Sequence, residues 1–473
     1  MKIKKLFENR ILAGFGILFI FSVIMGLVLA GDVIINAPAG EINATTINAP
    51  TGRTATYVVC ANDSVNKAQC DYVCDGVDDQ VEIQAANDAL PSSGGTIVIS
   101  SGHYSTSYRI VPKDNTTWLG YGAIIQGTNS SEDIFRWDLA GSENVKIMGF
   151  TLIGGKSGIK LGSSNNALIR DCTIKNPAYS GIYSYGSRNI TIENNHIIEV
   201  GEIGIQLDGG VSDFIVRGNL IKGDPVDTLY GIRTYPASNG VIENNIVRST
   251  KYNGISIYRD SNYVSVSGNI VHNTGHSAIA ISPAQYIIIS NNVVYGITSA
   301  DEAGIEVEWK STHGGNNASH DVVVSSNLVK DCNWGILVRN VDAGPISHDV
   351  IINNNDVSNC SIGIYLKNGT DISVKGNRLS NNSQNIQNTA VDVSIMYNDG
   401  YTTENSGNVS KKNGDTISHG LDCTPTYISV TPSNADHIAS VTAKSSSTFT
   451  LGLKDYNGTA ITTPEEIYWY AEC

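Results

Sequence analysis

Carboxylates and histidines gather in one short stretch of the chain. Glu306 and Glu308 lie two residues apart in a strand-like segment, and Asp301 and Glu302 lie in the loop that precedes it. Like charges at this spacing either raise one another's pKa or recruit a cation. We therefore predict acid–base chemistry at Glu306 and Glu308. Asp301 and Glu302 are candidate ligands for a calcium ion. His276, whose imidazole exchanges protons near neutral pH, is a further candidate catalytic residue.

Arginines and aromatic residues occur in the neighbouring stretches. Arg233 is predicted as a catalytic residue, because a guanidinium can neutralise a carboxylate beside the proton that a base removes. Aromatic rings offer apolar faces to pyranose rings, and charged groups bind sugar hydroxyls. The predicted substrate-binding residues are Asp208, Tyr235, Tyr258, Trp309 and Arg339. The alternative is an ordinary exposed strand surface, which also carries tyrosine and charge.

These residues belong to a repeat that fills the middle of the chain. A Gly-Ile pair, or Ala-Ile at 278, recurs every 23 to 31 residues, and each is named here by its first residue: Gly158, Gly181, Gly204, Gly231, Gly254, Ala278, Gly304, Gly335 and Gly363. An asparagine before apolar residues keeps the same period, with Cys172 in the earlier slot: Asn195, Asn219, Asn245, Asn269, Asn292, Asn327, Asn355 and Asn377. A period of about 20–50 residues indicates stacked units, and short strands without helices indicate a β-solenoid. Stacked asparagines can form a hydrogen-bonded ladder.

The repeat motifs carry a family resemblance. Segments such as Gly-Asn-Leu-Ile-Lys at 218–222, followed after a loop by Gly-Ile-x-Ile, resemble the pectate-lyase-like right-handed parallel β-helix family. The segment from Val73 through a short helix to Thr96 resembles the N-terminal cap of that superfamily. The resemblance covers roughly residues 70–400 and implies an all-β, single-stranded solenoid of about ten coils. It also implies a substrate cleft along one strand flank, between loops of variable length.

Alternation along the Gly-Ile strands predicts which side chains lie on that flank. With Ile205 and Leu207 inward, Gln206 and Asp208 should face solvent. Applied to every coil, this gives a solvent-facing row of Lys160, Tyr183, Tyr185, Gln206, Asp208, Arg233, Tyr235, Ser256, Tyr258, Ala280, Ser282, Glu306, Glu308, Leu337, Arg339, Tyr365 and Lys367. Arg339 should lie one coil after Glu308, and His276 one coil before it. The catalytic motifs of polygalacturonases, alginate epimerases and pectate lyases are not matched, so no catalytic role is carried over from the family.

Four segments are predicted. Residues 1–30 combine a basic start with an apolar run, as in a signal peptide or signal anchor, and 31–56 resemble a tether. Residues 57–400 form the capped β-helix, whose cap helix should begin at Asp79 with Glu82 completing a capping box. That helix should bury Val81, Ile83, Ala86, Ala89 and Leu90 on one face. Residues 401–473 resemble the small β-sandwich modules at the ends of phage-tail and microbial surface proteins.

Cysteines and sequons agree with export. Eleven Asn-x-Ser/Thr triplets occur, and an oxidising compartment favours disulfides among the eight cysteines. Cys332 and Cys360 each follow a repeat asparagine by five residues, so they should stack one coil apart and form a bridge. A second bridge is predicted between Cys423 and Cys473, and a buried free thiol at Cys172.

Composition narrows the partners. A formal net charge of −14 argues against nucleic acid and fits a secreted or cell-surface protein whose partner is an extracellular polysaccharide. Membrane contact would come only through the N-terminal anchor. Three functions stay open: a lyase or epimerase of polyuronates, a non-catalytic glycan-binding or adhesion protein, and a structural element of the cell envelope.

Overall fold

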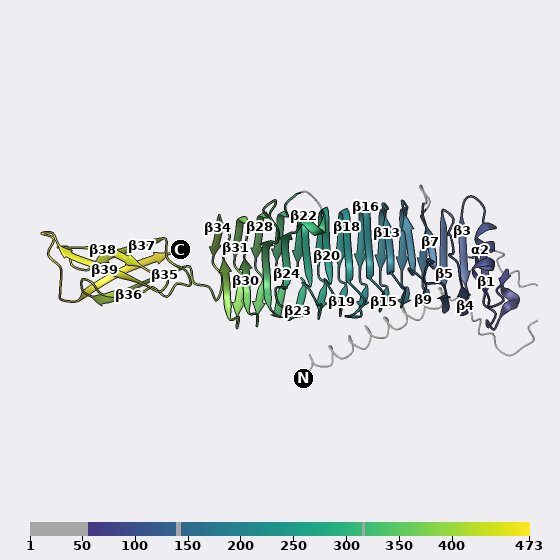
Figure 1. The fold of residues 1–473 in the computed structure, drawn as a ribbon, viewed down its shortest axis with the longest axis horizontal. Helices are drawn as coiled ribbons and strands as arrows, with labels where there is room; N and C mark the ends of the chain where they lie inside the picture. Colours follow the sequence, from purple (N-terminus) through teal and green to yellow (C-terminus); the bar gives the residue numbers. More distant parts are fainter. Residues whose placement is uncertain (1–54, 139–142, 315–316) are drawn as a thin grey trace, which may run out of the picture. The chain divides into compact units, whose positions relative to one another are not determined.

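The computed structural model describes residues 55–138, 143–314 and 317–473 (Figure 1). The predicted signal peptide or anchor at 1–30, and the tether up to residue 54, lie outside the described residues. Within the described ranges, no helix is both long and apolar enough to cross a membrane. Residues 57–396 form a parallel β-solenoid, with each strand paired to the equivalent strand of the next coil.

One large parallel sheet of 22 strands carries two strand positions of every coil and is joined to the cap. The Gly-Ile position is occupied by β7 Phe135–Trp137, β10 Ile159–Gly162, β13 Ser180–Tyr185, β16 Ile203–Arg217, β18 Tyr230–Glu243, β20 Ile255–Ser267, β22 Ile279–Ser290, β24 Ala303–Trp309, β27 Trp334–Asn340, β30 Ile362–Leu366 and β33 Gln384–Asn388. The next position is occupied by β5 Thr116–Gly120, β8 Lys146–Met148, β11 Asn165–Arg170, β14 Arg188–Glu193, the second halves of β16, β18, β20 and β22, and then β25 His320–Ser325, β28 His348–Asn353, β31 Thr370–Lys375 and β34 Val393–Met396.

A second parallel sheet of 12 strands carries the third position. Its strands are β4 Gly102–Thr106, β6 Ala123–Gly127, β9 Thr151–Gly154, β12 Thr173–Lys175, β15 His196–Ile198, β17 Leu220–Lys222, β19 Ile246–Arg248, β21 Ile270–His272, β23 Val293–Ile297, β26 Leu328–Cys332, β29 Asp356–Ser358 and β32 Arg378–Ser380. The solenoid thus has about twelve coils rather than the predicted ten. The first coils carry neither the Gly-Ile pair nor the repeat asparagine, so the sequence repeat does not reveal them.

The predicted register is confirmed. Ile205 pairs with Ile232, Ile232 with Ile255, and Ile279 with Ile305, and the same correspondence links every Gly-Ile position from 159 to 364. These isoleucines are fully buried and belong to one continuous apolar core along the solenoid. Because a parallel in-register sheet superimposes equivalent residues, an apolar residue repeated at one position of each coil forms a continuous column within this core.

The asparagine ladder is also confirmed, and it extends one coil further to Asn398. From Asn195 onward, each Nδ2 donates to the Oδ1 of the next ladder asparagine at 2.9–3.0 Å. Each Oδ1 also accepts the backbone N–H of the preceding ladder residue, and Cys172 N donates to Asn195 Oδ1 at 3.0 Å. Cys172 is a buried free thiol, as predicted. The ladder satisfies backbone groups at a corner that water does not reach.

The N-terminal cap contains helix α2, Gln80–Asp88, which follows β1 Tyr57–Cys60, η1 Lys67–Gln69 and β2 Tyr72–Val73 and precedes β3 Gly95–Ile99. Asp79 occupies the N-cap position, but the predicted capping box is wrong. The buried Asp79 carboxylate instead accepts the N–H groups of Gly76 and Ser105, each at 2.7 Å. It ties the helix to strand β4 rather than to its own first turn. Ile83, Ala86 and Leu90 are buried as predicted, whereas Val81 and Ala89 are exposed.

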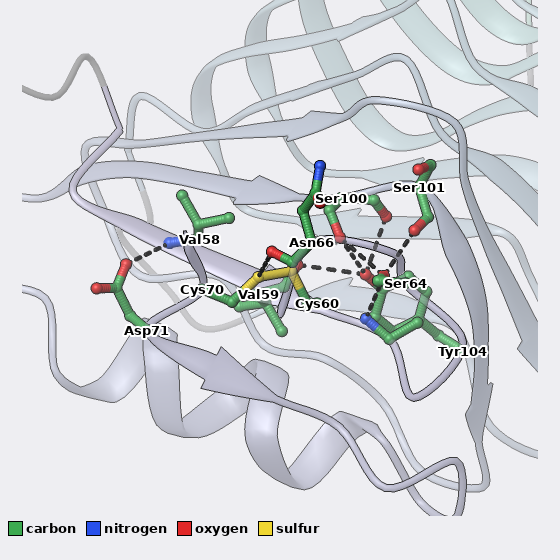
Figure 2. The surroundings of a disulfide bond; sticks show 11 residues. Val58, Val59, Cys60, Ser64, Asn66, Cys70, Asp71, Ser100, Ser101 and Tyr104 are labelled. Carbon is green, nitrogen blue, oxygen red and sulfur yellow. Dashed lines mark hydrogen bonds between the residues drawn. A yellow bond between two sulfur atoms is a disulfide. The ribbon is translucent and has the colours of Figure 1, made fainter. Parts of the chain in front are cut away.

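A disulfide between Cys60 and Cys70 closes the loop beside β1 (Figure 2). Within this loop, Ala61 N donates to Ser64 Oγ at 3.0 Å, and Ser64 Oγ donates to the Ser101 carbonyl at 2.7 Å (Figure 2). The spacing of the cysteines in the sequence did not predict this pairing of Cys60 with Cys70.

The predicted bridge between Cys332 and Cys360 is wrong. The two residues do stack on adjacent coils and are buried, but both are free thiols. Each Sγ donates to the carbonyl two residues earlier in the chain, Cys332 to Lys330 O at 3.2 Å and Cys360 to Ser358 O at 3.3 Å. Equivalent side chains of stacked coils lie side by side and point in the same direction. Here the two thiols form hydrogen bonds to backbone carbonyls and no disulfide.

Residues 404–472 form a small β-sandwich with its own core. One antiparallel sheet contains β35 Glu404–Lys411, β37 Tyr427–Pro432 and β40 Glu465–Glu472, and the other contains β36 Thr416–Ser418, β38 His437–Lys444 and β39 Thr448–Asp455. Phe449, Leu451 and Ile467 lie in its core. The predicted disulfide between Cys423 and Cys473 is present. The resemblance of this module to phage-tail modules stays a prediction.

Candidate functional site

A pocket of about 340 Å³ opens on the Gly-Ile flank of the solenoid. It spans neighbouring coils in which each of the strands β18, β20, β22, β24 and β27 pairs with the next; β18, β20 and β24 are labelled in Figure 1. Its lining combines acids, bases and aromatic rings: Tyr230, Tyr252, Asn253, Tyr258, His276, Glu302, Glu306, Glu308, Lys310, His313 and Arg339.

Coil stacking brings the charged groups together. Glu308 on β24 is the register partner of Arg339 on β27, and Glu306 pairs in register with Ala280 on β22. His276 precedes β22 by three residues, and its Nδ1 lies 3.4 Å from Glu302 Oε1. The positions predicted for His276 and Arg339, one coil on either side of the glutamates, are those observed.

Glu306 is a buried carboxyl at the bottom of the pocket. Its Oε1 lies 2.6 Å from Arg339 Nε, and its Oε2 lies 2.6 Å from Ser277 Oγ. Burial first, and the neighbouring charge of Glu308 second, raise the pKa of Glu306 well above its ordinary value, against the attraction of Arg339. Glu306 therefore retains a proton at a pH where an exposed glutamate has lost it.

Glu308 has the opposite behaviour although it is equally buried. Burial favours its neutral form, but the adjacent His313 imidazole and the Arg339 guanidinium outweigh burial and lower the pKa of Glu308. Its Oε1 lies 3.1 Å from His313 Nδ1, and its Oε2 lies 3.3 Å from Arg339 Nε. The two glutamates form a coupled pair in which Glu306 holds the proton and Glu308 the charge.

The Ser277 hydroxyl gives an independent argument for this protonation. Its Oγ lies 2.8 Å from Glu302 Oε2 and 2.6 Å from Glu306 Oε2. A serine hydroxyl has one proton and cannot donate to both carboxylates. One of the two carboxyls must therefore donate to Ser277, and the raised pKa identifies Glu306. A hydrogen-bonded path then runs from Glu306 through Ser277 to Glu302, beside His276.

Aromatic rings form the walls. Tyr258 is buried, stacks on His313 with ring centroids 4.2 Å apart, and donates to Asn253 Oδ1 at 3.0 Å. The Tyr252 ring lies 4.7 Å from the His276 ring, nearer the mouth, where the His276 side chain is 47% exposed. The pocket thus has a buried acidic floor and a half-exposed imidazole at its opening.

The prediction that the flank side chains face solvent is wrong for the middle of the row. Lys160, Tyr183, Tyr185, Asp208, Arg233, Tyr235, Arg339, Tyr365 and Lys367 are exposed or half-buried, whereas Gln206, Ser256, Tyr258, Ala280, Ser282, Glu306, Glu308 and Leu337 are at most 3% exposed. Two causes are visible. Side chains of stacked coils cover one another, and the segment after β24, including η2 Ser311–His313, places His313 over Tyr258.

The other predicted residues lie apart from the pocket lining. Asp208 is half-buried and accepts the N–H of Gly209 at 2.7 Å, while Arg233 and Tyr235 lie beside the pocket. Trp309 is 7% exposed and packs against Gly344, where an added Cβ would come within 2.2 Å of the indole. Trp309 is therefore a packing residue of the loop rather than an exposed platform.

The predicted calcium ligands are used differently. Glu302 accepts both the N–H and the hydroxyl of Ser277, at 3.0 and 2.8 Å. Asp301 is exposed, and its backbone carbonyl accepts from Arg339 at 3.0 Å. Among the described residues, the group that brings three potential metal-binding atoms together is Cys74, Asp79 and Glu82 in the cap, where burial raises the pKa of the Cys74 thiol. No described contact gives Asp301 and Glu302 a third ligand.

Sequence reasoning missed Ser277, Tyr230 and Tyr252 as pocket residues. Their positions relative to the repeat could have identified them. Tyr252, His276 and Glu302 each stand two residues before the Gly-Ile or Ala-Ile pair of consecutive coils. Ser277 stands one residue before such a pair, as Tyr230 does in an earlier coil. Aligning the residues before each pair would have placed these side chains in one stack.

Comparisons with known proteins agree with the solenoid. The family description "Right handed beta helix region" matches residues 138–294 and 227–346. A cell surface glycoprotein of Methanothermus fervidus is 26% identical over 224 residues, which cover 44% of this chain and 37% of that protein. The chain thus spans well under half the length of this curated relative.

Solved structures with the same fold have different activities. The A-module of a mannuronan C-5 epimerase from Azotobacter vinelandii has a TM-score of 0.57 at 18% identity, covering 68% of this chain and 97% of that one. An alpha-1,3-glucanase from Streptomyces thermodiastaticus has a TM-score of 0.59 at 18% identity, covering 74% and 70%. The tailspike of Escherichia coli bacteriophage HK620, solved with a pentasaccharide, has a TM-score of 0.56 at 12% identity, covering 84% and 90%. At these identities the likeness shows the fold alone.

Proposed function

Because the solenoid is a right-handed parallel β-helix with an acid–base pocket on its flank, we propose that this protein is displayed outside the cell and acts on a polysaccharide at Glu306. The proposed reaction class is β-elimination or epimerisation of a uronic acid unit. The observation that carries the proposal is the buried pair of carboxyls in different surroundings: Glu306 lies 2.6 Å from Ser277 Oγ, and Glu308 lies 3.1 Å from His313 Nδ1. Their pKa values shift in opposite directions, upward for Glu306 and downward for Glu308. Neighbouring carboxyls with separated pKa values supply a proton donor and a charged partner at one pH.

The geometry suggests a role for each group. His276, half-exposed and held by Glu302, is the proposed base that removes the proton on the carbon beside the sugar carboxylate. Lys310 lines the pocket and offers a positive charge to that carboxylate. In elimination, the electron pair forms a carbon–carbon double bond, the glycosidic carbon–oxygen bond breaks, and Glu306 protonates the departing oxygen. In epimerisation, Glu306 donates its proton to the opposite face of the same carbon, and His276 keeps the proton that it removed.

The charge of the pocket is compatible with an anionic sugar. With Glu306 neutral, the negative charges of Glu302 and Glu308 are matched by Arg339 and Lys310. A site with all three glutamates ionised would instead repel a uronate carboxylate. The raised pKa of Glu306 is therefore needed for the proposed substrate class as well as for proton donation.

Display outside the cell is proposed on three grounds. The chain is similar to a cell surface glycoprotein, it contains two disulfides among the described residues, and it carries eleven sequons. A non-catalytic glycan-binding role is the second candidate. One observation favours it: the pocket carboxylates already contact protein partners, which would suit a rigid binding site.

The test is a screen of polyuronates for turnover, with and without a calcium chelator. New ultraviolet absorbance reports the unsaturated product of elimination, and hydrogen exchange at the carbon beside the carboxylate reports epimerisation. The variants Glu306→Gln, His276→Ala and Arg233→Ala are compared with Glu143→Gln, which alters an exposed carboxylate on a distant coil. We expect the first two to lose turnover and the third to bind more weakly. If all three keep wild-type turnover and binding on a glycan that the wild type recognises, the site lies elsewhere; binding without any turnover selects the second candidate.

A further inference from the structure

Two arginines on adjacent coils share one tyrosine ring beside the Glu306 pocket. The guanidinium carbon of Arg233 lies 5.1 Å from the centroid of the Tyr235 ring, and that of Arg259 lies 4.7 Å from it. The two guanidinium carbons are therefore at most about 10 Å apart, and like charges within this range repel each other unless a negative charge lies between or beside them. Cation–π contacts with one ring offset only part of this repulsion.

Neither arginine forms an ion pair with a described carboxylate, although Asp260 adjoins Arg259 in the chain and lines the same cavity. Arg136, Arg217 and Arg339 form ion pairs with carboxylates at 2.6–2.7 Å. Arg233 and Arg259 form none within 4.0 Å, although the chain has a net charge of −14. Moreover, the Nε of Arg233 is buried and has no hydrogen-bond acceptor. A buried guanidinium N–H without an acceptor is costly, so the charge of Arg233 is not fully compensated within the described residues.

The pair adjoins two cavities, the Glu306 pocket and a second one. Arg259 lines a second, shallower cavity of about 580 Å³ together with Pro236. On the other side, Arg233 lies 5.1 Å from the ring centroid of Tyr230, which lines the Glu306 pocket. Tyr230 therefore connects the Glu306 pocket to Arg233, and Arg259 connects the arginine pair to the second cavity.

We propose that Arg233, Tyr235 and Arg259 form a binding subsite for the anionic group of a sugar unit, either a carboxylate or a sulfate. This inference rests on the proposed function, because it takes the ligand of the subsite to be part of the chain that reaches Glu306. The two guanidinium groups bind the anion by charge-assisted hydrogen bonds, and the Tyr235 ring holds them in place.

Coil register sets the spacing between subsite and pocket. Arg233 pairs with Ser256, Ser256 with Ala280, and Ala280 with Glu306. Three coil steps correspond to about 14 Å along the solenoid. A ligand that occupies both places therefore carries its negative charge several sugar units away from the reacting unit, as a regular polyanionic glycan does.

The test measures binding in the Glu306→Gln background, so that turnover does not enter. Isothermal titration compares oligogalacturonate, oligomannuronate and oligoguluronate with the methyl ester of oligogalacturonate, and dextran sulfate with dextran. We expect one anionic ligand to bind about tenfold or more tightly than its neutral counterpart, and Arg233→Gln or Arg259→Gln to remove most of that difference. Arg259→Lys should keep part of it. Arg248→Gln, an exposed arginine on β19 of the other sheet, is the matched control and should change nothing.

The outcomes separate this inference from the proposed function. Arginine-dependent binding of uronates identifies a carboxylate subsite, and arginine-dependent binding of dextran sulfate alone identifies a sulfate subsite. Equal binding of charged and neutral ligands, unchanged affinity in both glutamine variants, or no anionic ligand bound at all overturns the subsite. Absence of turnover in the wild type would count against the proposed function and would leave this binding result standing. Circular dichroism of each variant checks that it is folded.

Discussion

Replacing Glu306 with glutamine removes a titrating group while keeping its shape. Burial and the charge of Glu308 raise the pKa of Glu306 well above its ordinary value of 4.5. The folded protein keeps this proton over a pH range in which the unfolded chain has lost it. The stabilising contribution of Glu306 is therefore complete below the unfolded-state pKa and is lost as the pH rises through the folded-state pKa.

The size of the effect follows from proton linkage. Between the two pKa values, one extra proton is bound by the folded state, so the free energy of unfolding falls by about 1.4 kcal/mol per pH unit. The Glu306→Gln variant lacks this dependence. Glu308 has the opposite sign: its pKa is lowered, so its contribution is present above 4.5 and is lost only as the pH falls through the lowered value. As the pH rises from about 5 to 7, the wild type should therefore lose stability relative to the variant, at a rate of at most about 1.4 kcal/mol per pH unit.

Guanidinium chloride unfolding across this pH interval, followed by circular dichroism, measures the difference for the two proteins. Glu143→Gln, which removes an exposed carboxylate, is the control and should run parallel to the wild type. A difference between wild type and Glu306→Gln that stays constant with pH, or that shifts in favour of the wild type as pH rises, would mean that Glu306 is ionised in the folded protein. The protonation assigned to the pocket would then be wrong.

Three further outcomes are expected. Asn269→Ala should lower the free energy of unfolding by about 3–5 kcal/mol, because Asn245 N and the Ile242 carbonyl lose buried partners at 2.9 Å; retention of wild-type stability would count against the ladder. Ser277→Ala should cost about 1–3 kcal/mol, because Glu306 loses a buried hydrogen bond, whereas Ser282→Ala, whose buried hydroxyl has no partner, should cost less; equal losses would argue against the Ser277 bridge. In the unfolded, unreduced protein, iodoacetamide should label the four described free thiols by peptide mapping and spare the paired cysteines: labelled Cys74, Cys172, Cys332 and Cys360; spared Cys60, Cys70, Cys423 and Cys473. A protected Cys332–Cys360 peptide would restore the bridge.

The core and the ladder were predictable from sequence because a parallel solenoid superimposes equivalent positions. Once Ile232 and Ile255 are aligned by their preceding glycines, their stacking follows without knowledge of the loops. The same reasoning placed Arg339 over Glu308 and His276 near Glu302, since all four stand at fixed offsets from a repeat position.

The features that sequence did not predict depend on parts that do not repeat. The burial of Tyr258 and Glu308 depends on the segment after β24, which places His313 over them and has no counterpart in other coils. Likewise, Asp79 binds Ser105 of the first coil instead of capping its own helix, a contact between segments 26 residues apart. The repeat determines the coil and strand position of a residue. Its burial and its contact partners depend on these segments that occur only once.

The most direct test of the proposed chemistry is hydrogen exchange in a polyuronate. The wild type is incubated with each polyuronate in D2O, and proton nuclear magnetic resonance follows the signal of the carbon-bound hydrogen beside the carboxylate. Both elimination and epimerisation break this bond, so the signal should diminish with at least one substrate, and Glu306→Gln should slow the loss by about a hundredfold or more, as expected when a general acid is removed. An unchanged signal with every polyuronate, or equal rates for wild type and Glu306→Gln, would contradict catalysis at this pocket.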